Sequence, residues 1–295
     1  MSDAPSTGPA STGLPLAASL DGPAGKPVLV LGPSLGTARE VWDPQVPALA
    51  AHFRLLRYDL PGHARPPARG APRDPATPPG PYSVAGLGLG VLALLDRHGL
   101  DRVHYAGISI GGMIGMWLAA RAPGRIAALG LCCTSAHLPP AKGEGEGGWL
   151  ARAEQVRSAG MTSITEQSLG RWFTEPFVRA CPATVAAHAA TLAAVEPEGY
   201  AGCCEAIAAM DLRPLLGSIT APALVIAGSE DPATPPAHGA LIASQIHAAR
   251  LRVIRGAAHL ANVQAHGQVT AALLAHLTAV NRADGEHASP DSRKP

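Results

Sequence analysis

Aromatic side chains are scarce in this 295-residue sequence, and neither sign of charge dominates it. Phe, Trp and Tyr make up 4% of the residues, whereas hydrophobic residues as a whole make up 47%. The chain can therefore bury a sizeable core, but it must build that core mainly from small aliphatic side chains. The 23 basic and 22 acidic residues give a net charge of +1 without blocks of one sign, which argues against nucleic acid and anionic membranes as partners.

The sequence also lacks a disulfide framework, a zinc-binding pattern and a membrane-spanning run. Its five cysteines are odd in number, include two adjacent pairs and show no metal-ligand spacing with histidine, so we interpret them as buried, reduced thiols. No segment approaches the roughly 18 consecutive apolar residues that cross a bilayer. Residues 1–26 lack the basic start and the apolar centre of a signal peptide. These absences predict a soluble, cytoplasmic protein.

From Lys26 onward, short apolar runs alternate with longer segments of helical periodicity. This alternation is typical of an α/β fold with a mostly parallel central sheet flanked by helices. We expect strands over residues 28–31, 53–58, 103–108, 126–132, 223–227 and 251–254. We expect helices over residues 83–98, 112–121, 238–247 and 266–280.

The alternation stops between residues 137 and 216, where helical stretches occur without convincing strands. An all-helical segment between two halves of one sheet predicts a lid over the carboxyl ends of the strands, where open α/β sheets bind ligands. The sequence thus predicts a core over residues 13–136 and 217–281 and a helical lid over residues 137–216. The polar tails, residues 1–12 and 282–295, are expected to be disordered.

A serine follows the third predicted strand in Gly107-Ile108-Ser109-Ile110-Gly111, which has the form G-x-S-x-G. An apolar strand before the motif and a predicted helix after it form the setting of the nucleophile elbow of α/β-hydrolases. The glycines leave room for a strained turn that exposes the hydroxyl at the positive end of the helix. We therefore predict that Ser109 is a nucleophile in an α/β-hydrolase fold.

An acid and a histidine follow in the chain order of that fold, which is nucleophile, acid, histidine. Asp231 comes shortly after the fifth predicted strand, and His259 lies in the loop after the sixth. Asp231 would orient His259, and His259 would act as a general base on Ser109. Glu230 is the neighbouring alternative to Asp231. We expect His63 to shape a loop beside the site or to contact site residues from behind.

Two backbone N–H groups should complete the site as an oxyanion hole. Ile110, the residue after the nucleophile, is expected to supply one of them. The loop Gly32-Pro33-Ser34-Leu35-Gly36-Thr37, after the first predicted strand, should supply the other, and Leu35 is our choice within it. Such preorganised donors usually supply the largest single share of catalysis.

With these residues placed, the chain resembles the 3-oxoadipate enol-lactonases, α/β-hydrolases that open an enol-lactone in the β-ketoadipate route of aromatic degradation. The resemblance runs from about Lys26 to Val280 and is most specific in the lid. Three residues depart from the family pattern: Pro33 replaces a polar residue, Ile110 replaces Met and Ala64 replaces Gly. The stretches that carry the resemblance are Leu35–Thr37, Val41–Gln45, Arg57–Asp59, Gly107–Gly112, Arg171–Thr174, Glu198–Ala206, Asp211–Arg213, Val225–Gly228, Asp231–Pro236 and Ala257–Val263.

The resemblance implies hydrolysis of 3-oxoadipate enol-lactone through a serine acyl-enzyme, with no cofactor and no metal. It also implies one small-molecule partner, a lactone that bears a carboxylate. A similar Trp-x-x-Arg occurs in enol-lactonases where this chain has Trp149 and Arg152, so we expect Arg152 to bind the carboxylate, with Arg171 as the second choice. Ser34 and Trp172 complete the predicted substrate-binding residues.

Three other functions are compatible with the same fold. Another carboxylesterase or lactonase would use the same three catalytic residues. A cofactor-free haloperoxidase-like hydrolase can share an identical triad. A ligand-binding module without catalysis needs only a closed pocket, and the complete triad argues against it. The sequence carries no signal for a particular oligomeric state.

Overall fold

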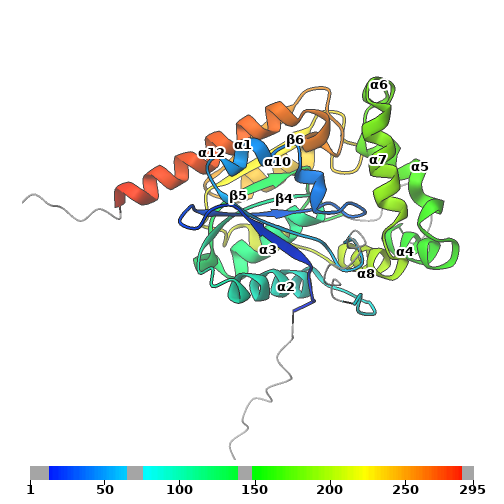
Figure 1. Cartoon of the computed structure of the whole chain (residues 1–295), viewed down its shortest axis with the longest axis horizontal. Coiled ribbons are helices and arrows are strands. Elements are labelled where there is room, and N and C mark those ends of the chain that lie inside the picture. Colours follow the sequence, from blue (N-terminus) through cyan, green and yellow to red (C-terminus); the bar gives the residue numbers. More distant parts are fainter. Residues whose placement is uncertain (1–12, 65–75, 139–147, 288–295) are drawn as a thin grey trace, which may run out of the picture.

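One seven-stranded sheet organises the chain in the computed structural model, which describes residues 13–64, 76–138 and 148–287 (Figure 1). The strand order is β1-β3-β2-β4-β5-β6-β7, and all neighbours are parallel except β1 and β3. The strands are β1 (Ala18–Asp21), β2 (Val28–Gly32), β3 (Arg54–Tyr58), β4 (Val103–Ile108), β5 (Ile126–Cys132), β6 (Ala223–Gly228) and β7 (Ala249–Ile254). The predicted α/β fold with a mostly parallel sheet is confirmed.

Helices cover both faces of this sheet, which is why its central strands are buried apolar runs. The short α1 and the long α12 pack on one face, and α2 and α3 pack on the other (Figure 1). None of the described helices is long and apolar enough to cross a membrane. The bounds of the core helices are η1 (Arg39–Trp42), α1 (Val46–Ala50), α2 (Val84–Arg97), α3 (Ile110–Arg121), η2 (Pro123–Arg125), α9 (Arg213–Leu216), α10 (Pro236–Gln245), α11 (Ala261–Gln264) and α12 (His266–His287).

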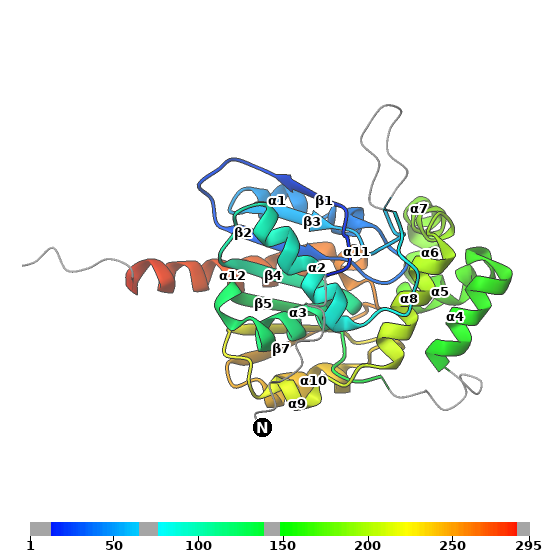
Figure 2. The ribbon, with the colours of Figure 1, turned by 90° about the horizontal axis from the view of Figure 1, so that it is seen from below.

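Between β5 and α9 the chain forms a group of helices at one end of the sheet, here named the helical insertion (residues 148–208; Figure 2). Within the insertion, α4 packs extensively against α8, where the Arg157 guanidinium pairs with Glu198 at 2.8 Å and with Glu205 at 2.6 Å. The helices are α4 (Gly148–Ala159), η3 (Met161–Ile164), α5 (Thr165–Trp172), α6 (Glu175–Ala180), α7 (Pro182–Ala193) and α8 (Pro197–Ala208).

Two expectations about the chain ends need correction. The sequence analysis missed β1, because this short edge strand is only half-buried and shows no continuous apolar run. It also placed a disordered tail from residue 282, whereas α12 continues to His287. Once formed, a helix gains one backbone hydrogen bond per added residue, and the sequence offers no proline before Pro290 to stop it. The predicted tail at residues 1–12 lies outside the described residues.

Candidate active site

Ser109 occupies a sharp turn between β4 and α3. Its backbone has φ 56° and ψ −121°, an uncommon conformation for a residue other than glycine. Two neighbouring glycines make the turn possible by close backbone approach, since a Cβ on Gly107 would lie 2.3 Å from the carbonyl of Gly111. The Ser109 carbonyl accepts hydrogen bonds from the Thr134 hydroxyl at 2.7 Å and from Gly112 N–H at 2.8 Å. The strained turn is therefore fixed through the Ser109 carbonyl, by Thr134 after β5 and by Gly112 in the first turn of α3.

His259 and Asp231 lie together at the carboxyl ends of β7 and β6. The His259 Nδ1–H donates to Asp231 Oδ2 at 2.8 Å, and both side chains are buried. The other carboxylate oxygen accepts from the N–H groups of Ala233 and Thr234. Burial alone would raise the pKa of Asp231, but His259 and the Thr234 hydrogen bonds outweigh it and lower the pKa to about 2. Asp231 is therefore ionised near neutral pH, and Nε2 of His259 is left as the proton acceptor.

Glu230, the alternative acid, is exposed to solvent. Its backbone N–H donates to the Ala257 carbonyl at 3.0 Å, whereas His259 Nδ1 is bonded to Asp231 at 2.8 Å. The geometry therefore favours Asp231 over Glu230 as the partner of His259.

One cavity brings most of the predicted side chains together, although Asp231 and Ile110 are not part of its lining. Ser109 and His259 line it, as do the predicted substrate-binding residues from both the core and the helical insertion. Its lining is Ser34, Leu35, Ser109, Trp149, Arg152, Ser168, Arg171, Trp172, Tyr200, Ala233 and His259. The sequence analysis did not single out Ser168 and Tyr200. Tyr200 lies inside a quoted insertion motif, and Ser168 precedes Arg171 and Trp172 by three and four residues, on the same face of α5.

Arg152 carries a positive charge into this cavity from α4. Its Nε–H donates to the Tyr200 hydroxyl at 2.8 Å, its Nη2 donates to Ser168 Oγ at 2.6 Å and its Nη1 donates to Gln167. The guanidinium carbon also lies 5.7 Å from the centre of the Tyr200 ring. Within the described part of the chain, all the side chains bonded to Arg152 are neutral. They orient the guanidinium without cancelling its charge.

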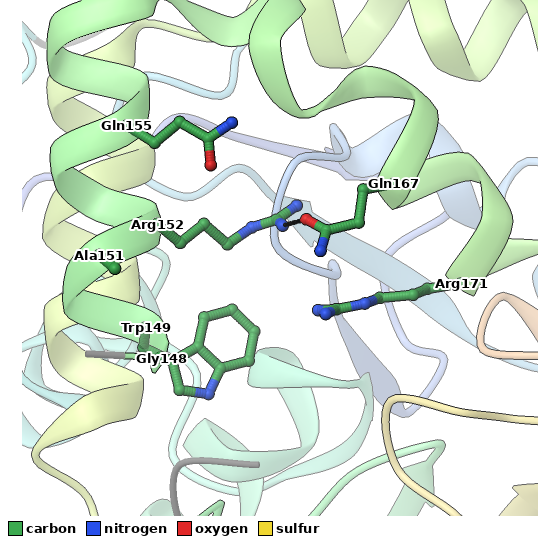
Figure 3. Close-up of a pocket in the computed structure, with 7 residues that line it drawn as sticks. All are labelled: Gly148, Trp149, Ala151, Arg152, Gln155, Gln167 and Arg171. Atoms are coloured by element: carbon green, nitrogen blue, oxygen red, sulfur yellow. Dashed lines mark hydrogen bonds between the residues drawn. The ribbon is translucent and has the colours of Figure 1, made fainter. Parts of the chain in front are cut away.

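A second, polar pocket adjoins the cavity and shares Trp149, Arg152 and Arg171 with it. Figure 3 shows Arg152 from α4 and Arg171 from α5 pointing toward one another across this pocket. Gln155 and Gln167 lie beside them and add polar groups (Figure 3). Two arginines at the junction of the two pockets suit a ligand that carries a carboxylate.

The two predicted oxyanion donors belong to segments in backbone contact. Ile110 is the first residue of α3, so its N–H has no acceptor inside the helix. Gly111 N–H donates to the Pro33 carbonyl at 3.1 Å and so joins α3 to the loop that carries Leu35. Gly36 turns this loop under the helical insertion with φ +78°, where a Cβ would lie 2.6 Å from the nearest side chain.

His63 lies behind the cavity wall and is not part of the cavity lining. The buried ring donates from Nδ1 to the Pro61 carbonyl at 2.9 Å and stacks on Tyr200 with 6.2 Å between ring centres. Burial lowers the pKa of His63 to about 4, against the opposing effect of the hydrogen bond to Pro61. His63 is therefore neutral and supports Tyr200, which in turn holds Arg152.

Comparison with known proteins places the chain among α/β-hydrolases. The family model described as the alpha/beta hydrolase fold matches residues 27–265. The chain is 38% identical to 3-oxoadipate enol-lactonase 2 of Acinetobacter baylyi over 82% of this chain and 85% of the relative. It is 32% identical to 3-oxoadipate enol-lactonase 1 of the same organism over 85% of this chain and 89% of the relative. The crystal structure of the enol-lactonase from Burkholderia xenovorans aligns with a TM-score of 0.82 at 37% identity, covering 89% of this chain and 96% of that one.

The neutral, buried His63 predicts a specific pH dependence of stability. Because its pKa falls from 6.5 in the unfolded chain to about 4 in the fold, the unfolded state binds more protons in this window, and stability is lost as the pH falls through it. The full window corresponds to about 3 kcal/mol of unfolding free energy. His63→Asn keeps a donor for Pro61 without a titrating ring, so urea denaturation should show a shallower loss of stability for this variant.

The matched control is His52→Asn, because His52 is exposed. Its unfolding free energy should follow that of the wild type at every pH. Parallel pH curves for His63→Asn and the wild type would contradict the assignment of a neutral His63.

Proposed function

Since this chain belongs to the α/β-hydrolase family, as a hydrolase similar to the 3-oxoadipate enol-lactonases, we propose that it hydrolyses 3-oxoadipate enol-lactone to 3-oxoadipate. The reaction would be its step in the β-ketoadipate route of aromatic degradation. One observation carries the proposal: a single cavity combines Ser109 and His259 with the guanidinium of Arg152, whose described partners are neutral. Ser109 and His259 suit attack on an ester carbonyl, and the Arg152 guanidinium suits a substrate with a free carboxylate.

In the first half of the reaction, Ser109 Oγ attacks the lactone carbonyl carbon while Nε2 of His259 takes the hydroxyl proton. Asp231 stabilises the imidazolium that forms. The N–H groups of Leu35 and Ile110 stabilise the negative charge on the carbonyl oxygen. The bond between that carbon and the ring oxygen then breaks, and the ring oxygen leaves as an enolate that takes the proton from His259. The resulting enol becomes the ketone of the product, which remains bound as an ester of Ser109.

In the second half, a water molecule takes the place beside His259 that the ring oxygen occupied, while the acyl chain stays esterified to Ser109. His259 takes a proton from the water as the water oxygen attacks the ester carbonyl. The N–H groups of Leu35 and Ile110 again stabilise the oxyanion. The bond to Ser109 Oγ breaks, and His259 returns the proton to the serine. The product leaves with two carboxylates, one more than the substrate.

Recognition of the substrate falls to the helical insertion in this proposal. A carboxylate that leaves bulk water needs a cation, and the fork of an arginine matches its geometry better than the point charge of a lysine. Arg152 is the proposed ligand, and Arg171 stands beside it at the junction of the two pockets. Trp149 and Trp172 would enclose the ring, and Ser34 lies next to the proposed oxyanion donor Leu35.

If Ser109 is the nucleophile, Ser109→Ala should retain the fold and lower kcat by roughly 10⁴-fold or more. The same change should abolish covalent labelling by a fluorophosphonate probe, which marks an activated serine. Steady-state kinetics and mass spectrometry of the labelled protein measure the two effects. Near-normal turnover of the variant would show that the mechanism is wrong.

If Asp231 orients His259, Asp231→Asn should lower kcat by roughly 10²- to 10⁴-fold, because the amide favours the wrong tautomer of the imidazole. Glu230→Gln is the matched control, since it makes the same chemical change at the neighbouring exposed position. Its kcat should stay close to that of the wild type. The opposite ranking of the two variants would assign the role to Glu230.

If Arg152 binds the substrate carboxylate, Arg152→Met should lower kcat/KM for the enol-lactone by roughly 30- to 1000-fold, or about 2–4 kcal/mol. Hydrolysis of a neutral p-nitrophenyl ester should barely change, since that substrate has no carboxylate to lose.

The control for Arg152 is Arg179→Met, which removes an exposed guanidinium from α6. It should leave both substrates unaffected. Equal losses on both substrates for Arg152→Met would indicate structural damage, and no loss on either would remove Arg152 from the site.

A further inference from the structure

Gln264, the last residue of α11, uses the full hydrogen-bonding capacity of its side chain. Its Nε2 donates to the Thr174 hydroxyl at 2.7 Å and to the Gly256 carbonyl at 2.6 Å. Its Oε1 accepts from Thr174 N–H at 3.2 Å and from Ala258 N–H at 3.3 Å. One amide group thus binds two places that are far apart in the sequence.

The two places are the loop that carries His259 and the turn between α5 and α6 of the helical insertion. Their backbones also meet directly: His259 N–H donates to the Arg171 carbonyl at 3.3 Å, and Leu260 N–H donates to the Trp172 carbonyl at 3.0 Å. We name these contacts the seam, formed by residues 171–174 and 256–260 together with Gln264. The seam is the point at which the insertion touches the chain on either side of the candidate base.

Thr174 supports a dedicated role for this contact. It stands at the N-cap of α6, where a threonine hydroxyl usually accepts from the first turn of its own helix. Here the side chain makes no capping hydrogen bond and instead accepts from Gln264. The helix thereby forgoes a local stabilising bond in favour of a contact with the His259 loop.

The loop around His259 depends on such outside partners. Ala257, Ala258 and Leu260 are buried, yet the loop between β7 and α11 has no regular secondary structure to satisfy its backbone groups. The insertion and Gln264 provide partners for the N–H groups of Ala258, His259 and Leu260. The orientation of the imidazole therefore depends on contacts with the insertion as well as on its bond to Asp231.

We propose that Gln264 is a positioning residue that couples docking of the helical insertion to the orientation of His259. The proposal rests on the proposed role of His259 as the general base. The helix that supplies the carbonyls of the seam, α5, also lines the cavity with Ser168, Arg171 and Trp172. The position of α5 in the cavity wall and the orientation of His259 therefore depend on the same hydrogen bonds.

The test uses Gln264→Met, which preserves length but removes all four hydrogen bonds, and Thr174→Val, which removes only the hydroxyl contact. We expect Gln264→Met to lower kcat by roughly 10- to 100-fold on both the enol-lactone and a neutral p-nitrophenyl ester. Thr174→Val should lower kcat by roughly threefold. The double variant should be no slower than Gln264→Met alone, because the Thr174 hydroxyl acts through Gln264. Gln245→Met, at an exposed position on α10, is the control and should have no effect.

Two readouts do not require lactonase activity. The rate at which a fluorophosphonate labels Ser109 should fall in Gln264→Met by the same factor as kcat on the ester. Amide hydrogen exchange, followed by mass spectrometry, should rise together in peptides covering residues 165–180 and 254–264. These results would support the coupling even if the enol-lactone proved not to be the substrate.

Three results would overturn the proposal: labelling at the wild-type rate in Gln264→Met, faster exchange in one of the two segments alone, or fully additive effects of the two substitutions. If Gln264→Met does not fold, Thr174→Val tests the proposal instead. A threefold loss of kcat together with faster amide exchange in both segments would support the coupling, and wild-type kcat and exchange would refute it.

Discussion

The contact between the end of β2 and the first turn of α3 is the constraint on which the rest of the site depends. Gly111 N–H donates to the Pro33 carbonyl at 3.1 Å, and a Cβ on Gly111 would lie 2.5 Å from the carbonyl oxygen of Gly32. These two segments carry the proposed oxyanion donors, the N–H groups of Leu35 and Ile110, and the strained serine lies between strand and helix. Because backbone touches backbone here, the relative position of the two segments depends on main-chain contacts and not on side-chain packing.

Two structural layers divide the proposed chemistry. The sheet and its loops hold the serine, the acid and the oxyanion donors, whereas the helical insertion holds Arg152, Trp149 and Tyr200. Attack on an ester carbonyl depends on the first layer, and selection of an anionic substrate depends on the second. The seam at Gln264 joins the layers at His259, whose loop donates hydrogen bonds to the helical insertion through its backbone and to Asp231 through the imidazole. Substrate choice could therefore change within the insertion without loss of the underlying chemistry as long as the contacts of the seam are kept.

The sequence predicts well what is determined locally and poorly what depends on tertiary contact. Ser109 is recognisable because a strand, a glycine-flanked turn and a helix follow one another in the chain, and the buried central strands are recognisable as apolar runs. The edge strand β1 has no such run, and no proline marks residue 282, where the sequence analysis ended the last helix, because the next proline is Pro290. Gln264 could not be found at all, because nothing adjacent to it indicates its partners, and Ser168 is marked only by its helical spacing from Arg171 and Trp172. Asp231 could be preferred to Glu230 only by position, and burial is what separates the two side chains.

The electrostatics of the cavity wall give the strongest reason to expect an anionic substrate. Burial keeps His63 neutral, and it raises the pKa of Tyr200 above its usual range despite the nearby Arg152, so both supporting side chains are uncharged at neutral pH. A carboxylate of the protein in their place would neutralise Arg152 and leave little attraction for a ligand. With neutral supports, the guanidinium is oriented by hydrogen bonds and retains its full charge, and in the proposed function the carboxylate of the substrate would complete the ion pair. Under the proposed function, an anionic ligand would add a charged partner to the hydrogen bonds that Arg152 already makes, whereas a neutral ester would not, so the preference for a charged lactone would depend on the same three residues.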